Sequence, residues 1–388
     1  MLLHKSEYKM TERNAHGLLG KLFGDLREIW VEIPGDCHLN CSYCFAYENK
    51  KDFEFTREAG GALRTDKRQC LLSLNEILAN IKQFDEDFPL TEQEKAERVN
   101  KRLAIPAAGE PFVNGRMRQY AYGILDECKK RGIIPTVFTT GDKITEEDIY
   151  RLGCYEDNLR LFVKFNSAKP EIQDKLVGRK GYTQARNKIL RRLISAGFND
   201  GRLGIVTSVM EANADELPSM LIFARQNNLL FDADTILERG RGVNCRRKYN
   251  DGENRRIFEA LEKLRKLDAE RYGNHWKAIP TYVGSDPCTR FEHHVYIKGD
   301  GEVSPCVGTP QIVYGNTRLA TLKEIWNSSL ARIIRNHQIM GECAGCENYR
   351  DGSCYSCLSR STEGLNQEDI LRTGKILTIG CGICGPVE

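Results

Sequence analysis

The most informative segment of the sequence is Gly35-Asp36-Cys37-His38-Leu39-Asn40-Cys41-Ser42-Tyr43-Cys44-Phe45. It holds three cysteines within eight residues, spaced by three and then two residues, directly after an expected β-strand. A cubane cluster has four irons, so three thiolates from one tight loop leave one iron without a protein ligand. The spacing therefore predicts an open iron at which a second molecule can bind.

Zinc is the alternative metal for these cysteines. It accepts three cysteines and one histidine, and His38 or a distant residue could complete such a site. Structural zinc sites usually pair their ligands as CxxC, however, and a spacing of three then two residues is unusual for them. The spacing favours an iron–sulfur cluster.

Short β-rich runs alternate with longer segments of helical period between Glu28 and about Arg241, as in parallel strands joined by crossover helices. The expected strands are Ile29–Pro34, Arg102–Ala107, Thr136–Thr140, Leu159–Asn166, Leu203–Met210 and Phe231–Leu237. The expected helices are Leu74–Phe88, Gly115–Arg131, Thr145–Leu152, Tyr182–Ala196 and Glu216–Asn227. Six such units predict an α/β fold, a partial (β/α)6 TIM-like barrel whose active site lies at the carboxyl ends of the strands.

The 388 residues suggest two or three domains at roughly 150 residues each. Residues 48–69 and 91–101 are too rich in charged residues to continue the core, so we expect surface insertions there. A charged helix over residues 254–272 leads out of the barrel, and a boundary is expected near Ile279-Pro280. We therefore expect an N-terminal extension (1–27), the barrel (28–280) and a small cysteine-rich C-terminal domain (281–388).

The composition of the chain limits the classes of partner and the location that we expect for it. With 57 basic and 54 acidic residues the net charge is only +3, too small a field to draw the chain onto nucleic acid. Apolar runs stay well below the roughly 18 residues that a membrane span needs. The first 20 residues lack the continuous apolar core of a secretory signal, which predicts a cytoplasmic protein.

Fifteen cysteines are the anomaly of the composition, and in a cytosolic chain they indicate metal binding or catalysis rather than disulfides. Eight of them follow the barrel and make two complete sets of four ligands, which predicts a second metal region. These are Cys288, Cys306, Cys343, Cys346, Cys354, Cys357, Cys381 and Cys384.

The first motif, with Tyr43 and Phe45 flanking Cys44, resembles the signature of the radical S-adenosylmethionine (SAM) superfamily. Ala107-Ala108-Gly109-Glu110-Pro111 resembles the Gly-Gly-Glu-Pro segment of that family, with Ala108 in place of the first glycine. The resemblance implies a [4Fe–4S] cluster on Cys37, Cys41 and Cys44 whose open iron binds SAM. It also implies that Gly109 and Glu110 hold the SAM amino group.

By the same resemblance, later strand ends should contact SAM. The residues concerned are Thr139 and Thr140 for the adenosine, Asn166 and Ser167 for the ribose or methionine, and Arg179 for the carboxylate, which a guanidinium pairs bidentately. Tyr43 and Phe45 are counted with these cofactor-binding residues. Polar residues at strand ends also cap helices, which leaves a structural role open for each.

The C-terminal cysteines resemble the SPASM domain of radical SAM enzymes, since Cys288, Gly301 and Cys306 fit its opening pattern. The four-cysteine run departs from the family, with gaps of seven and two residues where five and three are usual. The resemblance implies two auxiliary [4Fe–4S] clusters, to which Cys381 and Cys384 would add the last ligands. One auxiliary cluster with a zinc ion, or zinc alone, remains an alternative.

The implied function is reductive cleavage of SAM to a 5′-deoxyadenosyl radical, which abstracts hydrogen from a substrate carbon. An electron donor such as flavodoxin or ferredoxin would reduce the cluster. About 27 residues precede the first strand, too few for a peptide-leader-binding domain. We therefore expect epimerisation or dehydrogenation of a small polar, sugar-like natural product, with maturation of a ribosomal peptide as the alternative.

Three residues after the sixth strand are further candidates. Cys245 could return a hydrogen atom to the substrate radical as a catalytic residue, although a packed loop cysteine is the plainer interpretation. Arg239 and Arg241 could neutralise a carboxylate of SAM or of the substrate. A non-catalytic iron–sulfur or zinc-binding protein is the alternative of another class, but it would have no use for a SAM pocket.

Overall fold

One large sheet organises the chain. The computed structural model describes residues 25–33, 35–46, 71–106, 108–237, 239–242, 251–273, 290–309, 311–350 and 366–378. Within these residues the sheet has nine strands in the order β6-β5-β4-β3-β2-β1-β7-β8-β9. The first six strands along the chain are parallel neighbours: β1 (Glu28–Val31), β2 (Arg102–Ile105), β3 (Ile134–Thr139), β4 (Arg160–Lys164), β5 (Leu203–Val209) and β6 (Leu230–Thr235). The predicted partial (β/α)6 barrel is confirmed.

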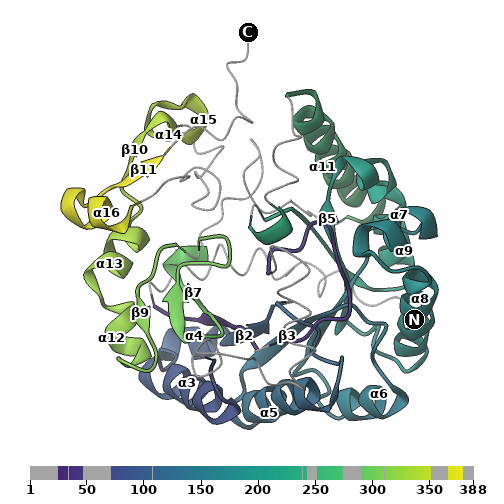
Figure 1. Ribbon diagram of the computed structural model, residues 1–388, viewed down its shortest axis with the longest axis horizontal. Helices are drawn as coiled ribbons and strands as arrows, with labels where there is room; N and C mark the ends of the chain where they lie inside the picture. The colour runs from purple at the N-terminus through teal and green to yellow at the C-terminus, as the bar shows by residue number, and fades with distance from the viewer. Residues whose placement is uncertain are drawn as a thin grey trace.

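Helices cover the outer face of the six parallel strands (Figure 1). Local signals start and stop them: Ser73 and Glu76 form a capping box before one helix, and Gly132 ends another with φ 65°. The helices between and after the strands are α3 (Leu74–Asp87), α5 (Gly115–Arg131), α6 (Glu146–Gly153), α8 (Tyr182–Ser195), α9 (Leu217–Gln226) and α11 (Asp251–Tyr272). Their bounds agree closely with the predicted helices.

Two helices of the barrel lie where none is predicted, α4 (Glu92–Ala96) and α7 (Pro170–Val177). The first lies within residues 91–101, most of which are exposed as expected, but Glu94 and Lys101 are buried. Glu94 is fully buried, and its carboxylate accepts hydrogen bonds from Arg27 Nε at 2.5 Å and Nη2 at 2.9 Å. The carboxylate of Glu94 can be buried because it is paired with the Arg27 guanidinium, and a hydropathy pattern does not reveal such a pair. The second expected insertion, residues 48–69, lies outside the described residues.

The two faces of the barrel strands differ. Ile29, Val137 and their alternating neighbours are fully buried in the apolar core. The other face carries aromatic rings that meet across strands: Trp30 of β1 lies 5.8 Å from Phe138 of β3, and Phe138 stacks on Phe162 of β4 at 5.5 Å. Since β2 separates β1 from β3, Trp30 and Phe138 can meet only on the concave side of the sheet. Aromatic side chains therefore fill the inside of the barrel at the level of these three rings.

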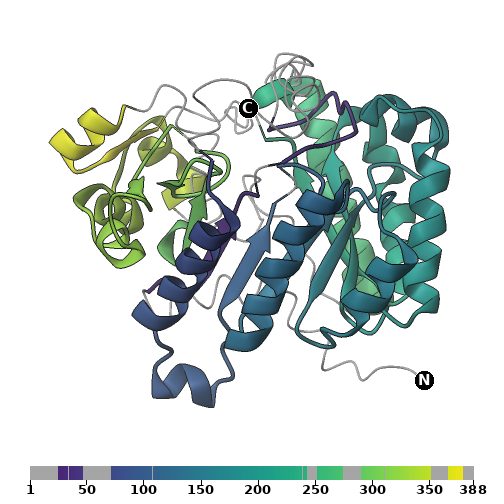
Figure 2. The same ribbon diagram turned by 60° about the horizontal axis from the view of Figure 1, so that its bottom comes forward.

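The C-terminal region begins by extending the same sheet (Figure 2). Strand β7 (His294–Ile297) pairs in parallel with β1, and Trp30 lies opposite Tyr296. Strands β8 (Glu302–Ser304) and β9 (Gly315–Asn316) follow antiparallel. Beyond them lie α12 (Leu322–Trp326), α13 (Ser329–Asn336), β10 (Ile339–Gly341), α14 (Glu342–Gly345), α15 (Glu347–Arg350), α16 (Gln367–Thr373) and β11 (Ile376–Thr378). The expected boundary at residues 279–280 lies outside the described residues.

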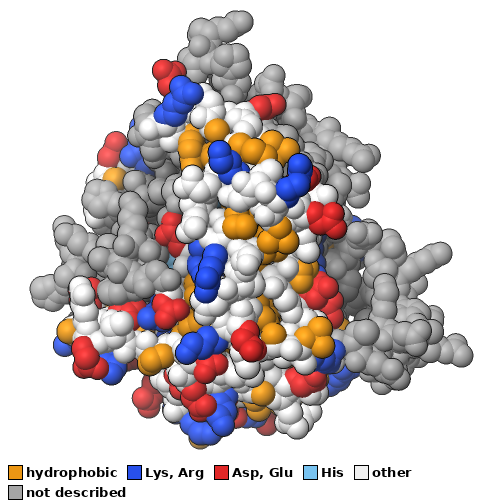
Figure 3. Space-filling model, turned by 90° about the vertical axis from the view of Figure 1, so that its left-hand side faces the viewer, with side chains coloured by type: hydrophobic (Ala, Val, Ile, Leu, Met, Phe, Trp, Pro, Cys, Tyr) orange, Lys and Arg blue, Asp and Glu red, His pale blue; other side chains and the backbone are white. Residues whose placement is uncertain are grey.

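The surface over these C-terminal elements carries basic and acidic side chains interspersed with apolar ones (Figure 3). Among the described residues, no helix has the length and apolar character to span a membrane.

Gly204 tests the packing inside the barrel. A Cβ at this position of β5 would lie 2.5 Å from Phe162 Cε1, so Gly204→Ala forces the ring to move. We expect a destabilisation of about 1–3 kcal/mol, typical of overpacking. Chemical denaturation with an unchanged m-value measures it. Gly115→Ala, whose Cβ would meet no atom within 4 Å, is the matched control and should stay within about 1 kcal/mol of the wild type; equal stability of both variants would contradict the packed interior.

Candidate active site

The cysteine loop, residues 35–46, rests on the end of α7. Asn40 N donates to the Val177 carbonyl at 3.0 Å, and Ser42 N donates to the Leu176 carbonyl at 2.9 Å. Gly178 ends α7 with φ 66°, and a Cβ there would lie 2.9 Å from the Asn40 carbonyl oxygen. The glycine thus meets both requirements of this contact, a left-handed backbone and close approach.

Apolar side chains fix the loop from beneath. Leu39 packs with Val177 and Tyr182, and Tyr43 packs with Met210 and Ile236. Cys37, Cys41 and Cys44 are partly exposed, and the first two also pack against these clusters. Apolar packing therefore holds the loop in place and leaves part of each cysteine exposed.

The electrostatics around the thiols fit an iron–sulfur cluster. Burial, followed by the Cys44 thiolate, raises the pKa of Cys41 to about 11, and burial raises the pKa of Cys37 well above its usual range. Lys164 and Arg241 act in the opposite direction on Cys41. A site that disfavours bare thiolates, but sets two cations beside them, suits thiolates that share their charge with iron.

Gly109 meets the start of the loop at backbone distance. A Cβ on Gly109 would lie 2.8 Å from Gly35 Cα, and a Cβ on Gly35 would lie 2.9 Å from Gly109 Cα. Glu110 N donates to the Asp36 carbonyl at 2.8 Å. The glycine that the sequence motif retains is thus required for contact between the second strand end and the cysteine loop.

Glu110 is fully buried and oriented by the third strand end. Its carboxylate accepts hydrogen bonds from Thr139 Oγ1 at 2.6 Å, Thr140 N at 2.6 Å and Phe112 N at 3.2 Å. Burial raises the pKa of Glu110, and the hydrogen bonds from Thr139 and Thr140 oppose that effect. The structure brings Gly109, Glu110, Thr139 and Thr140 together; their role in SAM binding stays a prediction.

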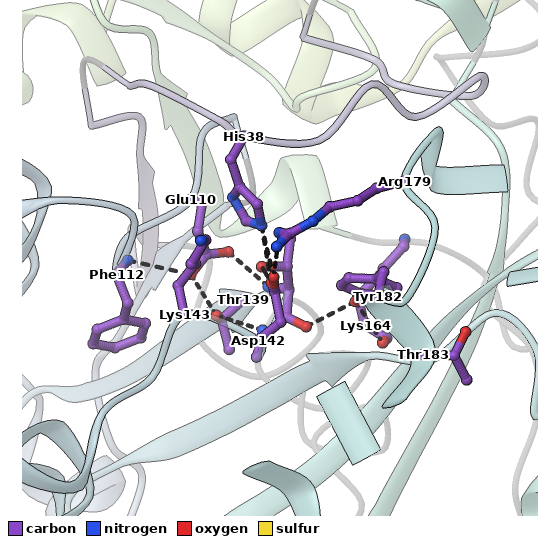
Figure 4. Close-up of polar contacts among 12 residues, drawn as sticks. His38, Glu110, Phe112, Thr139, Asp142, Lys143, Lys164, Arg179, Tyr182 and Thr183 are labelled. Carbon is purple, nitrogen blue, oxygen red and sulfur yellow. Dashed lines mark hydrogen bonds and ion pairs between the residues drawn. The ribbon is translucent and has the colours of Figure 1, made fainter. Parts of the chain in front are cut away.

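Asp142 joins the cysteine loop to Arg179, and the sequence analysis missed it (Figure 4). Its buried carboxylate accepts hydrogen bonds from His38 Nε2 at 2.9 Å, Arg179 Nη1 at 2.7 Å and Thr140 Oγ1 at 2.7 Å. Burial acts to raise the pKa of Asp142, but the hydrogen bond and charge of His38, then Thr140 and Arg179, hold it below its usual value. An acid directly after Thr139-Thr140-Gly141 at a strand end was the available signal.

His38 and Arg179 share the Asp142 carboxylate. The contact of His38 Nε2 with Asp142 links the cysteine loop to the third strand end. Arg179 keeps 39% of its side chain exposed while Asp142 fixes one end of its guanidinium. Its predicted role, binding the SAM carboxylate, stays a prediction.

The fourth strand end is largely structural. Ser167 Oγ donates to Glu216 at 2.7 Å, and the backbone amides of Asn166 and Ser167 donate to Gln173 Oε1 at 2.8 and 2.9 Å. Asn166 Oδ1 accepts from Ser208 N at 2.9 Å. Both residues are fully buried, and Ser167 holds the helix that follows β5. For Ser167 these contacts favour the structural role that the sequence left open.

Lys164, the last residue of β4, is a second residue that the sequence analysis missed. Its Nζ donates to Ser208 at 2.7 Å and lies 5.1 Å from the Tyr43 ring centroid. Burial lowers the pKa of Lys164, while Cys41, Cys44, Asp232 and Asp234 raise it. The two acids alternate along β6, so their spacing was the signal for a polar patch inside the barrel above the aromatic layer.

Arg239 and Arg241 were predicted to meet a carboxylate, and both bind backbone carbonyls. Arg239 Nη1 donates to Val307 at 3.2 Å, and Arg241 Nε donates to Cys41 at 2.7 Å. Phe45 lies partly buried on the cysteine loop.

Only part of the second metal region is described. Cys306 Sγ lies 3.4 Å from Thr309 Oγ1. Cys343 lies within α14 and Cys346 directly follows it, and Cys346 N donates to the Cys343 carbonyl at 3.1 Å. The predicted residues outside the described part of the chain are Cys245, Cys288, Cys354, Cys357, Cys381 and Cys384.

Comparison with known proteins agrees with this geometry. The sequence model of the SPASM family, described as an iron–sulfur cluster-binding domain, matches residues 288–347. SuiB of Streptococcus suis bound to SAM is a similar solved structure, with a TM-score of 0.62 at 14% identity over 92% of this chain and 79% of that chain. The chain shares the fold of this structure, and residues 288–347 match the SPASM family model.

Two further structures share this fold. SuiB bound to its precursor peptide SuiA has a TM-score of 0.61 at 15% identity, covering 92% of this chain and 77% of that chain. The protein anSMEcpe with bound SAM has a TM-score of 0.55 at 14% identity, covering 89% and 95%. No curated protein sequence matches the chain. The predicted family resemblance is confirmed at the level of the fold and of the SPASM domain.

Asp142→Asn tests the link between the radical SAM loop and Arg179. An amide offers donors to groups that already donate, so at least one of the three contacts to Asp142 is lost. We expect a stability loss of about 1–3 kcal/mol and less iron and sulfide per chain after anaerobic reconstitution. Asp126→Asn, which changes an acid 60% exposed on α5, is the matched control. Wild-type iron content and stability in Asp142→Asn would refute the proposed link.

Proposed function

We propose that this protein is a radical SAM enzyme whose catalytic [4Fe–4S] cluster is held by Cys37, Cys41 and Cys44. One observation carries the proposal: three partly exposed thiols lie on a loop whose start touches the Gly109-Glu110 turn at backbone distance. An electron carrier needs only the thiols. The adjoining turn, with its oriented carboxylate and nearby guanidinium, supports a site for a zwitterion such as the methionine part of SAM.

The residues of the chain divide the work of binding. Glu110, oriented by Thr139 and Thr140, is an acceptor for an ammonium group, and Arg179, held by Asp142, is a donor to a carboxylate. Tyr43 and Leu39 keep the loop closed over apolar neighbours and so restrict water. When bound, the reduced cluster and SAM supply methionine and a 5′-deoxyadenosyl radical that removes hydrogen from a substrate carbon.

The fate of the substrate radical depends on which group reacts with it next. Removal of one hydrogen atom leaves a carbon radical, and an oxidising outcome requires that one more electron leave it. An auxiliary cluster in the SPASM domain could accept that electron, whereas Cys245 could instead return a hydrogen atom, as an epimerase requires. An electron donor of the flavodoxin or ferredoxin type would supply the first electron.

The substrate class has two candidates. The polar set of Lys164, Ser208, Asp232 and Asp234 inside the barrel favours a polar substrate, such as an amino sugar. A peptide is the second candidate, because the similar structures include SuiB with its precursor peptide and anSMEcpe with the Cp18Cys peptide.

SAM cleavage is the direct test. We expect the anaerobically reconstituted chain, given dithionite and SAM, to form 5′-deoxyadenosine, measured by liquid chromatography and mass spectrometry. Cys44→Ala should reduce it to the level of a mixture without protein, because the cluster loses one of three ligands. Cys154→Ala, which changes an exposed cysteine outside the site, should retain wild-type formation. If the fully loaded wild type formed no 5′-deoxyadenosine, the enzyme assignment would fail.

Deuterium labelling separates epimerisation from dehydrogenation. A panel of amino sugars and short peptides is screened for compounds that accelerate 5′-deoxyadenosine formation, and the product is then made in deuterated water. A hydrogen returned by the Cys245 thiol adds one deuterium to the product, and Cys245→Ala should abolish that incorporation. A dehydrogenated product loses two hydrogens and gains no deuterium. Unchanged labelling in Cys245→Ala would exclude this cysteine as the donor.

A further inference from the structure

One short turn touches both metal regions of the chain. The 3-10 turn η4 (Gly240–Gly242) follows β6, and two arginines two residues apart lie at it. Arg241 Nε donates to the carbonyl of Cys41, a predicted ligand of the catalytic cluster, at 2.7 Å. Arg239 Nη1 donates at 3.2 Å to the carbonyl of Val307, which directly follows Cys306, a predicted ligand in the SPASM domain.

The backbone of the turn fixes this arrangement. Arg239 N donates to the Leu237 carbonyl at 2.8 Å, and Gly242 N donates to the Arg239 carbonyl at 2.9 Å. Gly240 has φ 55°, in the left-handed region, and a Cβ at Gly242 would clash with the Leu237 carbonyl oxygen. Two glycines thus build a tight turn from which one guanidinium reaches each metal region.

Arg239 is also held from the side of the sheet. Tyr296 of β7 donates its hydroxyl to Glu32, and the Glu32 carboxylate accepts a second hydrogen bond from Gly299 N at 2.9 Å. Burial raises the pKa of Tyr296 well above its usual range, and the charge of the nearby Arg239 opposes this. The guanidinium therefore lies between the β1–β7 edge of the barrel and the Cys306 segment.

The charge of these arginines bears on any cluster beside them. A cluster with thiolate ligands becomes more negative on reduction, so a fixed cation or a hydrogen bond near its ligands favours the reduced form. Arg241 lies beside a predicted cluster ligand, since its Nε donates to the Cys41 carbonyl at 2.7 Å. Arg239 is directed instead to the segment that follows Cys306.

We propose that Arg241 raises the reduction potential of the catalytic cluster, that Arg239 raises that of the auxiliary cluster on Cys306, and that η4 sets the two separately. This inference rests on the proposed function, since it requires both clusters. It assigns the arginines to the metal ligands rather than to a carboxylate of SAM or substrate. Tuning two clusters from one turn would set the direction of electron flow between them.

Redox titration followed by electron paramagnetic resonance tests the proposal on the reconstituted full-length chain. The signal that changes when SAM is added identifies the catalytic cluster. Arg241→Gln, which removes the charge but keeps an amide donor, should shift that potential to a more negative value and leave the auxiliary potential unchanged. Arg239→Gln should do the reverse.

Two further variants complete the design. Arg256→Gln removes an arginine that pairs with Glu211 and Asp215 on the surface, so it makes the same change in net charge away from η4 and should move neither potential. Arg241→Lys keeps the charge, so its catalytic cluster should titrate as in the wild type. If Arg241→Gln fails to retain a cluster, Arg241→Lys decides: a wild-type potential supports tuning by charge, and a lowered potential overturns it.

The outcomes separate this inference from the proposed function. Loaded clusters with unshifted potentials in Arg241→Gln and Arg239→Gln would overturn the inference while the enzyme assignment stands. Equal shifts of both clusters in either variant, or in Arg256→Gln, would also overturn it. A wild-type chain that takes up no cluster would overturn both proposals together.

Discussion

The contact between Gly35 and Gly109 is the constraint on which the site depends. It brings the start of the cysteine loop, after β1, against the turn that follows β2, and no side chain fits between the two backbones. Parallel strands in sequential order make this meeting possible, because the carboxyl ends of β1, β2 and β3 lie at one edge of the sheet. The same edge then brings Thr139, Thr140 and Asp142 to the loop, so a single backbone contact determines which polar groups surround the thiols.

Charge compensation is the second level of organisation. Burial of the cysteine loop disfavours the thiolate form of Cys37 and Cys41. The positive charges of Lys164 and Arg241, both from the barrel, oppose this effect at Cys41. Asp142 is the converse case, a buried negative charge with a basic side chain on either side. Its carboxylate joins His38 of the loop to Arg179, which follows α7. Opposite charges thus converge on one loop from the ends of β3, β4 and β6 and from the residue that follows the C-cap of α7, and the loop conformation and the charge balance depend on each other.

Sequence reasoning reached the strands, the main helices and the cysteine motif because each leaves a periodic or spaced pattern. It missed α4, where Glu94 is buried through its pairing with Arg27 and reads as a surface residue in any hydropathy pattern. It missed Asp142 and Lys164 for a related reason: their importance comes from partners 104 and 44 residues away. It offered a carboxylate as the possible partner of Arg239 and Arg241 but did not foresee the backbone carbonyls that each contacts, because a guanidinium in a sequence gives no sign of its acceptor.

The sheet extension through β7 explains how two metal regions can share one architecture. Because β7 pairs with β1, the segment that leads to Cys306 leaves the sheet beside the strand that leads to Cys37. The turn after β6 approaches from the other end of the sheet order and contacts both segments through Arg239 and Arg241. Strands at opposite ends of the six-stranded barrel are thereby linked across its mouth. An open barrel gains from this link a fixed distance between its cysteine loop and its SPASM domain, which sheet pairing on one side alone would not define.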